Sequence, residues 1–423
     1  MNANDKPASG MHLFYLDEAG VLFSEGTQEL HLLNGTATVI WSLLEEGHDA
    51  QSARAALQQM YGLDAERSSQ FVDAALAEWR DKGFLEGSPQ DPPEHLAVAP
   101  AAPAPASRLA WHQHEIVEER HYRVLGSGFR LRFSSIAQAR MVHPVLEHLE
   151  VRESSLEETA VDIVETANRL IVFRDREVFA ECADITELAP IIYSLVWVAA
   201  VNNHEFFLDI HAGVIGDGAK CILLPAPQGS GKSTLTAALV HAGFQYFSDE
   251  VALLEEGSFN VFPVPLAICV KVSGIDALAK QFANLRELQV HQRADGKRVI
   301  YLPPPPQFRP PSGNAYPVAA LIFPRYTPGA ETILTRLSTC DALKRLLDEC
   351  LVIRSPLDFT KIAALVQWMS QMPSYSLNFG STDDAVAGVR SVFVACAETA
   401  QVAFGMNDAP ADIASRPTNI DDG

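Results

Sequence analysis

Residues 222–234 read ILLPAPQGSGKST and join an aliphatic run to a loop rich in glycine, hydroxyl side chains and lysine. The aliphatic run is typical of a buried strand, and the following TLTAALVHAG has the pattern of a helix that ends at Gly243. A glycine-rich loop between a strand and a helix lets backbone N–H groups and the helix N-terminus hold phosphate oxygens. The stretch therefore predicts an α/β core that binds a nucleotide.

The positions of this loop predict separate contacts. We expect Lys232 to neutralise phosphate charge and the Ser233 hydroxyl to bind Mg²⁺. Ala226 takes the place of the usual first glycine, which a residue with negative φ can fill. ATP and Mg²⁺ are thus the expected cofactors, and the expected nucleotide-binding residues are Gly229, Ser230, Gly231, Lys232, Ser233 and Thr234.

Two acids follow in FSDEVALL, where Asp249 and Glu250 lie 17 and 18 residues after Lys232. One helix and one strand fill that gap, so we expect the acids at the end of the next strand, which can lie beside the strand of the loop. A carboxylate there can bind magnesium or accept the proton of a hydroxyl nucleophile. A surface turn with two solvated acids is the alternative.

Upstream, EFFLDIHAGVIGDGAKCILLP (residues 205–225) predicts a β-hairpin that turns at GDG and leads into the loop. The hairpin can return His211 to the phosphate site. By pattern alone, a single histidine at a strand end is more often structural.

Taken together, His211 with AGVI, then PAPQGSGKST, then FSDEVALL resemble the bacterial HPr kinase/phosphorylase family, especially its HPr-kinase-related branch. The resemblance covers residues 204–270 and implies a P-loop kinase that phosphorylates serine on a protein or peptide. By position, it implies that Asp249 is the catalytic aspartate and that Glu250 is the neighbouring acid, which binds the metal together with Ser233. It also implies that His211 belongs to the active-site network. The family's Glu-x-Arg-Gly signature is missing, so a second magnesium ligand and the reverse phosphorylase reaction lack support.

Basic residues further along are candidates for phosphate contacts. These are Lys271 and Arg325, each weighed against an ordinary solvated surface position. The proline-rich segment 296–313 is either a lid or substrate ledge, or a surface loop.

The front of the chain predicts short strands followed by three short helices, a winged-helix-like α+β domain. Winged helices often bind DNA, but residues 1–88 carry five basic and fourteen acidic side chains, which argues against a DNA reader. LHLLNGTATVIWSLLEEG and the later FVDAALAEWRDKGFLE resemble the PqqD family over residues 13–86. This resemblance implies recognition of leader peptides, by pairing of an extended peptide with an exposed strand. A structural or regulatory winged helix is the alternative.

The chain as a whole divides into five segments. We expect the winged-helix-like domain at 11–87, a proline- and alanine-rich linker at 88–107, an accessory α/β layer at 108–205, a P-loop kinase domain at 206–404 and a disordered tail at 405–423.

The composition excludes several classes. A formal charge of −21 disfavours nucleic-acid binding, and the six cysteines form no C-x-x-C pair. The apolar stretch 188–201 is shorter than the ~20 residues that a bilayer requires, and the start of the sequence lacks a signal-peptide pattern. We therefore expect a cytoplasmic protein without a membrane span, with homo-oligomers left open.

The function predicted from the sequence is an ATP-dependent kinase that phosphorylates a Ser or Thr hydroxyl of a recruited peptide or small protein, which is leader-peptide-like or HPr-like. A nucleotide-binding peptide chaperone or scaffold with little kinase activity is one alternative. A small-molecule hydroxyl kinase is another.

Overall fold

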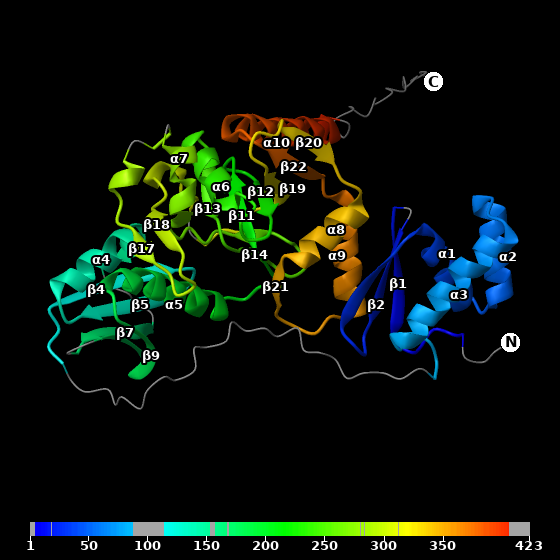
Figure 1. Ribbon diagram of the computed structural model, residues 1–423, viewed down its shortest axis with the longest axis horizontal. Coiled ribbons are helices and arrows are strands. Elements are labelled where there is room, and N and C mark those ends of the chain that lie inside the picture. Colours follow the sequence, from blue (N-terminus) through cyan, green and yellow to red (C-terminus); the bar gives the residue numbers. More distant parts are fainter. Residues whose placement is uncertain are drawn as a thin grey trace, which may run out of the picture.

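The computed structural model describes residues 5–17, 19–87, 114–152, 157–166, 169–279, 281–282, 284–311 and 313–405. The predicted linker 88–107 and all of the predicted tail except Gly405 lie outside these residues. Figure 1 shows the front domain, in blue, at one end and the accessory sheet, in cyan and green, at the other, with the core between them.

The front domain has the strands and helices that the sequence predicts. An antiparallel sheet in the order β1-β2-β3 precedes three helices, each with a polar N-cap: Asn34, Asp49 and Asp64 accept a hydrogen bond from a backbone N–H in the first turn. The elements are β1 (Met11–Leu16), β2 (Ala19–Ser24), β3 (Glu29–Leu33), α1 (Gly35–Glu45), α2 (Ala50–Tyr61) and α3 (Ala65–Asp81).

The β1–β2 hairpin is buried on both faces. Leu22 packs in a core with the front helices, whereas Phe14, Val21 and Phe23 pack in a second core with α8 (Thr339–Asp348) and α9 (Phe359–Gln371). The linker at 88–107 predicts a separately tethered module, but in the structure this domain is docked through a shared hydrophobic core. The apolar run in β2 is the cause, because residues on both faces of the strand need cover.

Polar contacts fix the same interface. The side chain of Gln28 accepts a hydrogen bond from Leu357 N–H (2.6 Å) and donates one to Leu357 O (3.1 Å). The Asp17 carboxylate accepts from Thr339 N–H, the first residue of α8, at 3.1 Å.

The central sheet has the order β13-β11-β12-β19-β22-β20 in the described chain. The predicted hairpin is confirmed over residues 212–225, where β11 and β12 are antiparallel, whereas residues 208–210 of the predicted range form a strand of another sheet. On its other side, β12 pairs in parallel with β19. The elements are β11 (Ala212–Gly216), β12 (Cys221–Pro225), α6 (Lys232–His241), β13 (Gln245–Ser248), β19 (Val318–Tyr326), β20 (Ile333–Arg336), β22 (Ser374–Phe379) and α10 (Thr382–Gly405).

Two smaller sheets flank the central sheet. Their orders are β15-β14-β10-β21 and β16-β18-β17. The elements of this region are β10 (Leu208–Ile210), β14 (Ala252–Leu254), β15 (Val261–Phe262), β16 (Ile268–Lys271), α7 (Ile275–Leu278), β17 (His291–Gln292), β18 (Arg298–Leu302) and β21 (Cys350–Ile353).

The accessory layer is a mixed sheet in the order β6-β4-β5-β7-β8-β9, covered by two helices. One helix among the described residues, Ile185–Asn202, is long and apolar enough to cross a membrane, and half of it is buried inside the structure. The elements are β4 (Glu118–Val124), β5 (Ser127–Phe133), α4 (Ile136–Leu146), β6 (Glu150–Val151), β7 (Glu158–Glu165), β8 (Leu170–Arg174), β9 (Glu177–Cys182) and α5 (Leu188–Asn202).

Candidate functional site

The glycine loop, residues 226–231, joins the end of β12 to the start of α6. Gly229 and Gly231 have φ values of 94° and 90°, which L side chains rarely adopt. A Cβ at Gly231 would also lie 2.8 Å from Tyr326 Cβ. Ala226 is not among the described residues with positive φ, as the sequence analysis requires. The loop therefore has two positions that only glycine fits well.

Lys232 begins α6 with its side chain buried, at 6% exposure. Its Nζ has no hydrogen-bond partner among the described residues. Burial lowers the pKa of Lys232, while the carboxylates of Glu250, Asp249 and Glu349 act in the opposite direction. A buried ammonium without a hydrogen-bond partner is costly, so this position is suited to an anion.

Asp249 lies immediately after β13 and is 1% exposed. One carboxylate oxygen accepts from Tyr246 O–H at 2.9 Å and the other from Cys269 N–H at 3.1 Å. Burial, followed by the neighbouring Glu250 charge, raises the pKa of Asp249 to about 7. Its carboxyl group therefore gains its charge near neutral pH.

The acids reach the glycine loop by a different path from the one expected. β13 does not lie beside β12, because β11 pairs with both and separates them. Since both pairings are antiparallel, β12 and β13 run in the same direction. The carboxyl end of β13 thus still meets the carboxyl end of β12, where the glycine loop begins.

His211 lies at the bend between β10 and β11. Its Nδ1 is 3.2 Å from Glu349 Oε2, and its backbone N–H donates to Glu349 O at 2.8 Å. Its Nε2 is 3.8 Å from Glu250 Oε2. Burial, followed by the charge of Lys232, lowers the pKa of His211 to about 4. The ring is therefore neutral at neutral pH, and one nitrogen is directed to each glutamate.

A cavity of about 310 Å³, here called the loop cavity, opens at the glycine loop. Its walls include all the predicted nucleotide-binding residues except Ser230, whose carbonyl accepts from Tyr326 N–H at 2.8 Å. Glu250 and His211 line the loop cavity, but Asp249 is not among its lining residues.

A second cavity of about 830 Å³, here called the α5 cavity, adjoins the first. It is walled by α5, β9 and the β17–β18 turn. The two cavities share four lining residues: His211, Glu250, Cys269 and Arg293. Whatever occupies one cavity is therefore close to what occupies the other.

Of the two basic residues predicted to contact phosphate, one lines the loop cavity and the other does not. Lys271 lines the loop cavity, whereas Arg325 is exposed and lies outside its lining, since the next residue, Tyr326, faces the cavity instead. Arg293, which lines both cavities, was missed, as was Glu349. Neither stands in a motif, and only the tertiary fold brings them to residues 211–250.

The proline-rich segment 296–313 touches both the glycine loop and the accessory layer. Lys297 Nζ donates to Gln228 Oε1 at 3.0 Å, and Arg309 donates to His148 O at 2.7 Å. Only its first part therefore reaches the site.

The described residues contain no cluster of three or more His, Cys, Asp or Glu side chains that could hold a metal ion. Ser233 and Glu250, the predicted metal ligands, both line the loop cavity. A Mg²⁺ ion takes several ligands from phosphate and water, so these two oxygen donors fit one.

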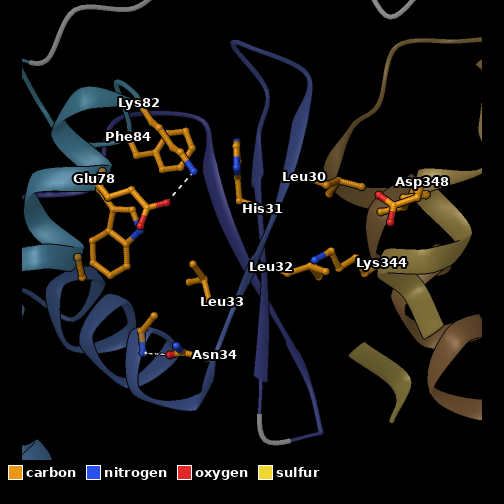
Figure 2. A pocket seen from close by; sticks show the side chains of 14 residues that line it. Leu30, His31, Leu32, Leu33, Asn34, Glu78, Lys82, Phe84, Lys344 and Asp348 are labelled. Atoms are coloured by element: carbon orange, nitrogen blue, oxygen red, sulfur yellow. Dashed lines mark hydrogen bonds and ion pairs between the residues drawn. The ribbon is translucent and has the colours of Figure 1, made fainter. Parts of the chain in front are cut away.

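A third hollow, of about 440 Å³, runs along β3, which ends its sheet in the described chain. We call it the β3 groove. Figure 2 shows His31 and Leu33 on the side of α3, and Leu30 and Leu32 on the side of Lys344 and Asp348 in α8. Its apolar lining is completed by Ala37, Ala75, Trp79, Phe84 and Leu347.

Most of the residues that line this groove fall within a segment that matches a known family. Residues 19–85 match the family model described as coenzyme PQQ synthesis protein D (PqqD). These residues form a PqqD-like domain. The match confirms the prediction for the front of the chain, and it ends before the glycine loop, so the resemblance to HPr kinases stays a prediction.

Other comparisons add little. No curated protein matches the chain. Among the solved structures that match is TbiB1 in complex with the TbiA(beta) leader peptide, at 26% sequence identity and a TM-score of 0.19. The match covers 20% of this chain and 99% of that one.

Proposed function

We propose that the protein is an ATP-dependent kinase that phosphorylates a Ser or Thr hydroxyl of a peptide or small protein held by its PqqD-like domain. One observation carries the proposal: the buried Lys232 amine, without a hydrogen-bond partner in the described chain, stands behind a glycine loop at a cavity that also contains Glu250 and His211. A peptide chaperone that never uses ATP has no need for this arrangement.

The loop cavity would hold the nucleotide phosphates. The backbone N–H groups of the glycine loop and the N-terminus of α6 favour anions, and Lys232 adds a full charge. Ser233 and Glu250 would hold Mg²⁺, which neutralises phosphoryl charge when bound. Lys271 is placed to contact the same phosphates.

In this proposal His211 accepts the proton of the acceptor hydroxyl. The sequence analysis gave this role to Asp249, but Asp249 is buried behind Cys269 and lines neither cavity, whereas His211 lines both. Glu349 orients the ring through Nδ1, which leaves Nε2 for the hydroxyl. Bound phosphate also offsets the Lys232 charge, which raises the pKa of His211 and makes it a better base.

In the proposed reaction the acceptor oxygen forms a bond to the γ-phosphorus, and the bond from that phosphorus to the bridging oxygen of ADP breaks. The hydroxyl proton passes to His211 Nε2. Asp249 serves as buried negative charge beside Lys232.

The PqqD-like domain would supply the acceptor. An extended peptide that pairs with the free edge of β3 would place alternate side chains toward α3 and toward α8 (Figure 2).

The test uses the full chain, ATP labelled at the γ-phosphate, and peptides selected for binding from a display library. We expect label on a peptide hydroxyl, lost by a factor of about 100 in His211→Gln, as is usual for a general base. Asp249→Asn, the matched buried variant, should lose less than His211→Gln. ATP consumption without any labelled peptide would contradict the proposal in favour of a small-molecule kinase or an ATPase scaffold.

A further inference from the structure

The α5 cavity has no role in the proposed binding of the nucleotide or the leader peptide. It adjoins the loop cavity at His211, Glu250 and Arg293. A phosphoryl acceptor must stand at that junction to reach the γ-phosphate. At about 830 Å³ the cavity also has the size of ligand pockets in general.

One wall is a single stripe of α5. Ile191, Ser194 and Trp197 are three residues apart along the helix, and Pro190 is four before Ser194, so they share one face. The opposite face, with Leu188, Ile192, Leu195 and Val196, is buried in the accessory core. The helix is apolar on both sides because one side supports the sheet and the other lines this cavity.

A second wall is the edge of the accessory sheet. β9 is its last strand in the described chain, and the consecutive residues Val178, Phe179 and Ala180 line the cavity. Side chains of a strand alternate between its faces, so three consecutive lining residues indicate that the cavity runs along the strand's edge. An extended peptide can pair with such an edge.

The charges of the lining select the occupant. Arg169 and Arg293 face four carboxylates, Glu181, Glu187, Glu250 and Asp295. Arg169 pairs with Glu181 at 2.8 Å and Arg293 with Asp295 at 3.5 Å. Since Glu250 is assigned to Mg²⁺ above, the excess negative charge of this cavity is that of Glu187. An acidic occupant or a second nucleotide is disfavoured there.

We infer that the α5 cavity binds the hydroxyl-bearing segment of the acceptor peptide, with an apolar side chain beside the hydroxyl residue and a neutral or basic one nearby. This inference rests on the proposed kinase function. It assigns to the accessory layer the choice of the residue that is phosphorylated, while the β3 groove holds a separate part of the peptide.

The experiment measures label transfer from γ-labelled ATP, by the full chain, to short peptides with one serine whose neighbours are Phe, Lys or Glu. Peptides with Phe beside the serine and Lys nearby should be labelled best, and peptides with Glu worst. Ile191→Ala should raise the KM for the best peptide about tenfold, as expected for an apolar pocket that loses methylene groups, and leave the KM for ATP unchanged. Glu187→Gln should reduce the preference for Lys over Glu.

Two matched controls accompany these variants. Ile333→Ala removes an exposed isoleucine of β20, and Glu177→Gln removes a carboxylate of β9 that does not line the cavity. Neither should change the KM for the peptide. If wild type labels peptides and Ile191→Ala behaves like Ile333→Ala, the cavity assignment is wrong and the kinase function stands. If wild type labels no peptide, both the cavity assignment and the proposed kinase function are wrong.

Discussion

The β3 groove and the loop cavity use charge in opposite ways. In the groove, Glu78 and Lys82 form an ion pair at 2.7 Å, with both side chains at least 40% exposed. Such pairs contribute about 0–1 kcal/mol and adapt to different partners. At the loop cavity, Lys232 and the partly buried His211 have displaced pKa values, as does the buried Asp249 behind the lining, and such groups mark where chemistry is expected. The difference teaches that recognition and reaction are separable here, although α8 lines the groove and the residue after it, Glu349, contacts His211.

The largest effect should come from Lys232→Met. This variant removes the buried positive charge that we place behind the phosphates, so label transfer should fall about a thousandfold. Affinity for a fluorescent peptide selected on the wild type should stay unchanged, because the β3 groove does not contain Lys232. Lys220→Met, in the β11–β12 turn, is the control. A comparable loss of peptide affinity in Lys232→Met would refute the separation.

A smaller effect is expected from Leu32→Asp, and it concerns peptide affinity instead of phosphate transfer. This residue faces α8 across the groove, beside Lys344 (Figure 2). Affinity for the selected peptide should fall about tenfold, by fluorescence anisotropy, because an apolar contact is replaced by a carboxylate that a bound peptide would strip of water. Transfer to an untethered serine peptide should not change. Tyr61→Asp, an exposed position of α2, is the control, and equal losses in both variants would exclude the groove as the binding site.

The smallest effect concerns pH. The pKa of Asp249 is raised to about 7, so its carboxyl is neutral below that pH and charged above it. The charged form repels phosphate, and ATP affinity without magnesium should therefore weaken about threefold from pH 6 to pH 8. Asp249→Asn should remove the part of the dependence that Asp249 causes and leave the part that comes from ionisation of the ATP γ-phosphate. Calorimetric titration at the two pH values measures this, and an equal pH dependence in wild type and Asp249→Asn would reject Asp249 as the source.

Local pattern predicted much of the fold. The three short helices of the front domain and the hairpin before the glycine loop follow from short-range chemistry, and the structure confirms them. The insertion of β11 between β12 and β13 was not predicted, because strand order depends on contacts between distant segments. Docking of the front domain was missed as well, although the apolar run of β2 carried the signal.

The site was predicted in part. The sequence placed the glycine loop, the acids and His211 together, because each is tied to the loop by a short connection. Glu349 and Arg293 could not be found this way, since each comes from a distant segment without a motif. The burial of Asp249 depends on Tyr246 and on Cys269, which reaches it from the neighbouring sheet, and no spacing rule describes that contact.

The position of α8, at the β3 groove and directly before Glu349, has a consequence for engineering chimeric proteins. Lys344, Leu347 and Asp348 line the β3 groove, and the next residue, Glu349, holds His211. A PqqD-like domain exchanged at the chain boundary near residue 88 would leave behind the wall of its groove that α8 supplies. A transplant that retains its peptide preference must therefore carry α8 along with the first 87 residues, or redesign the surface of α8 to match the new domain.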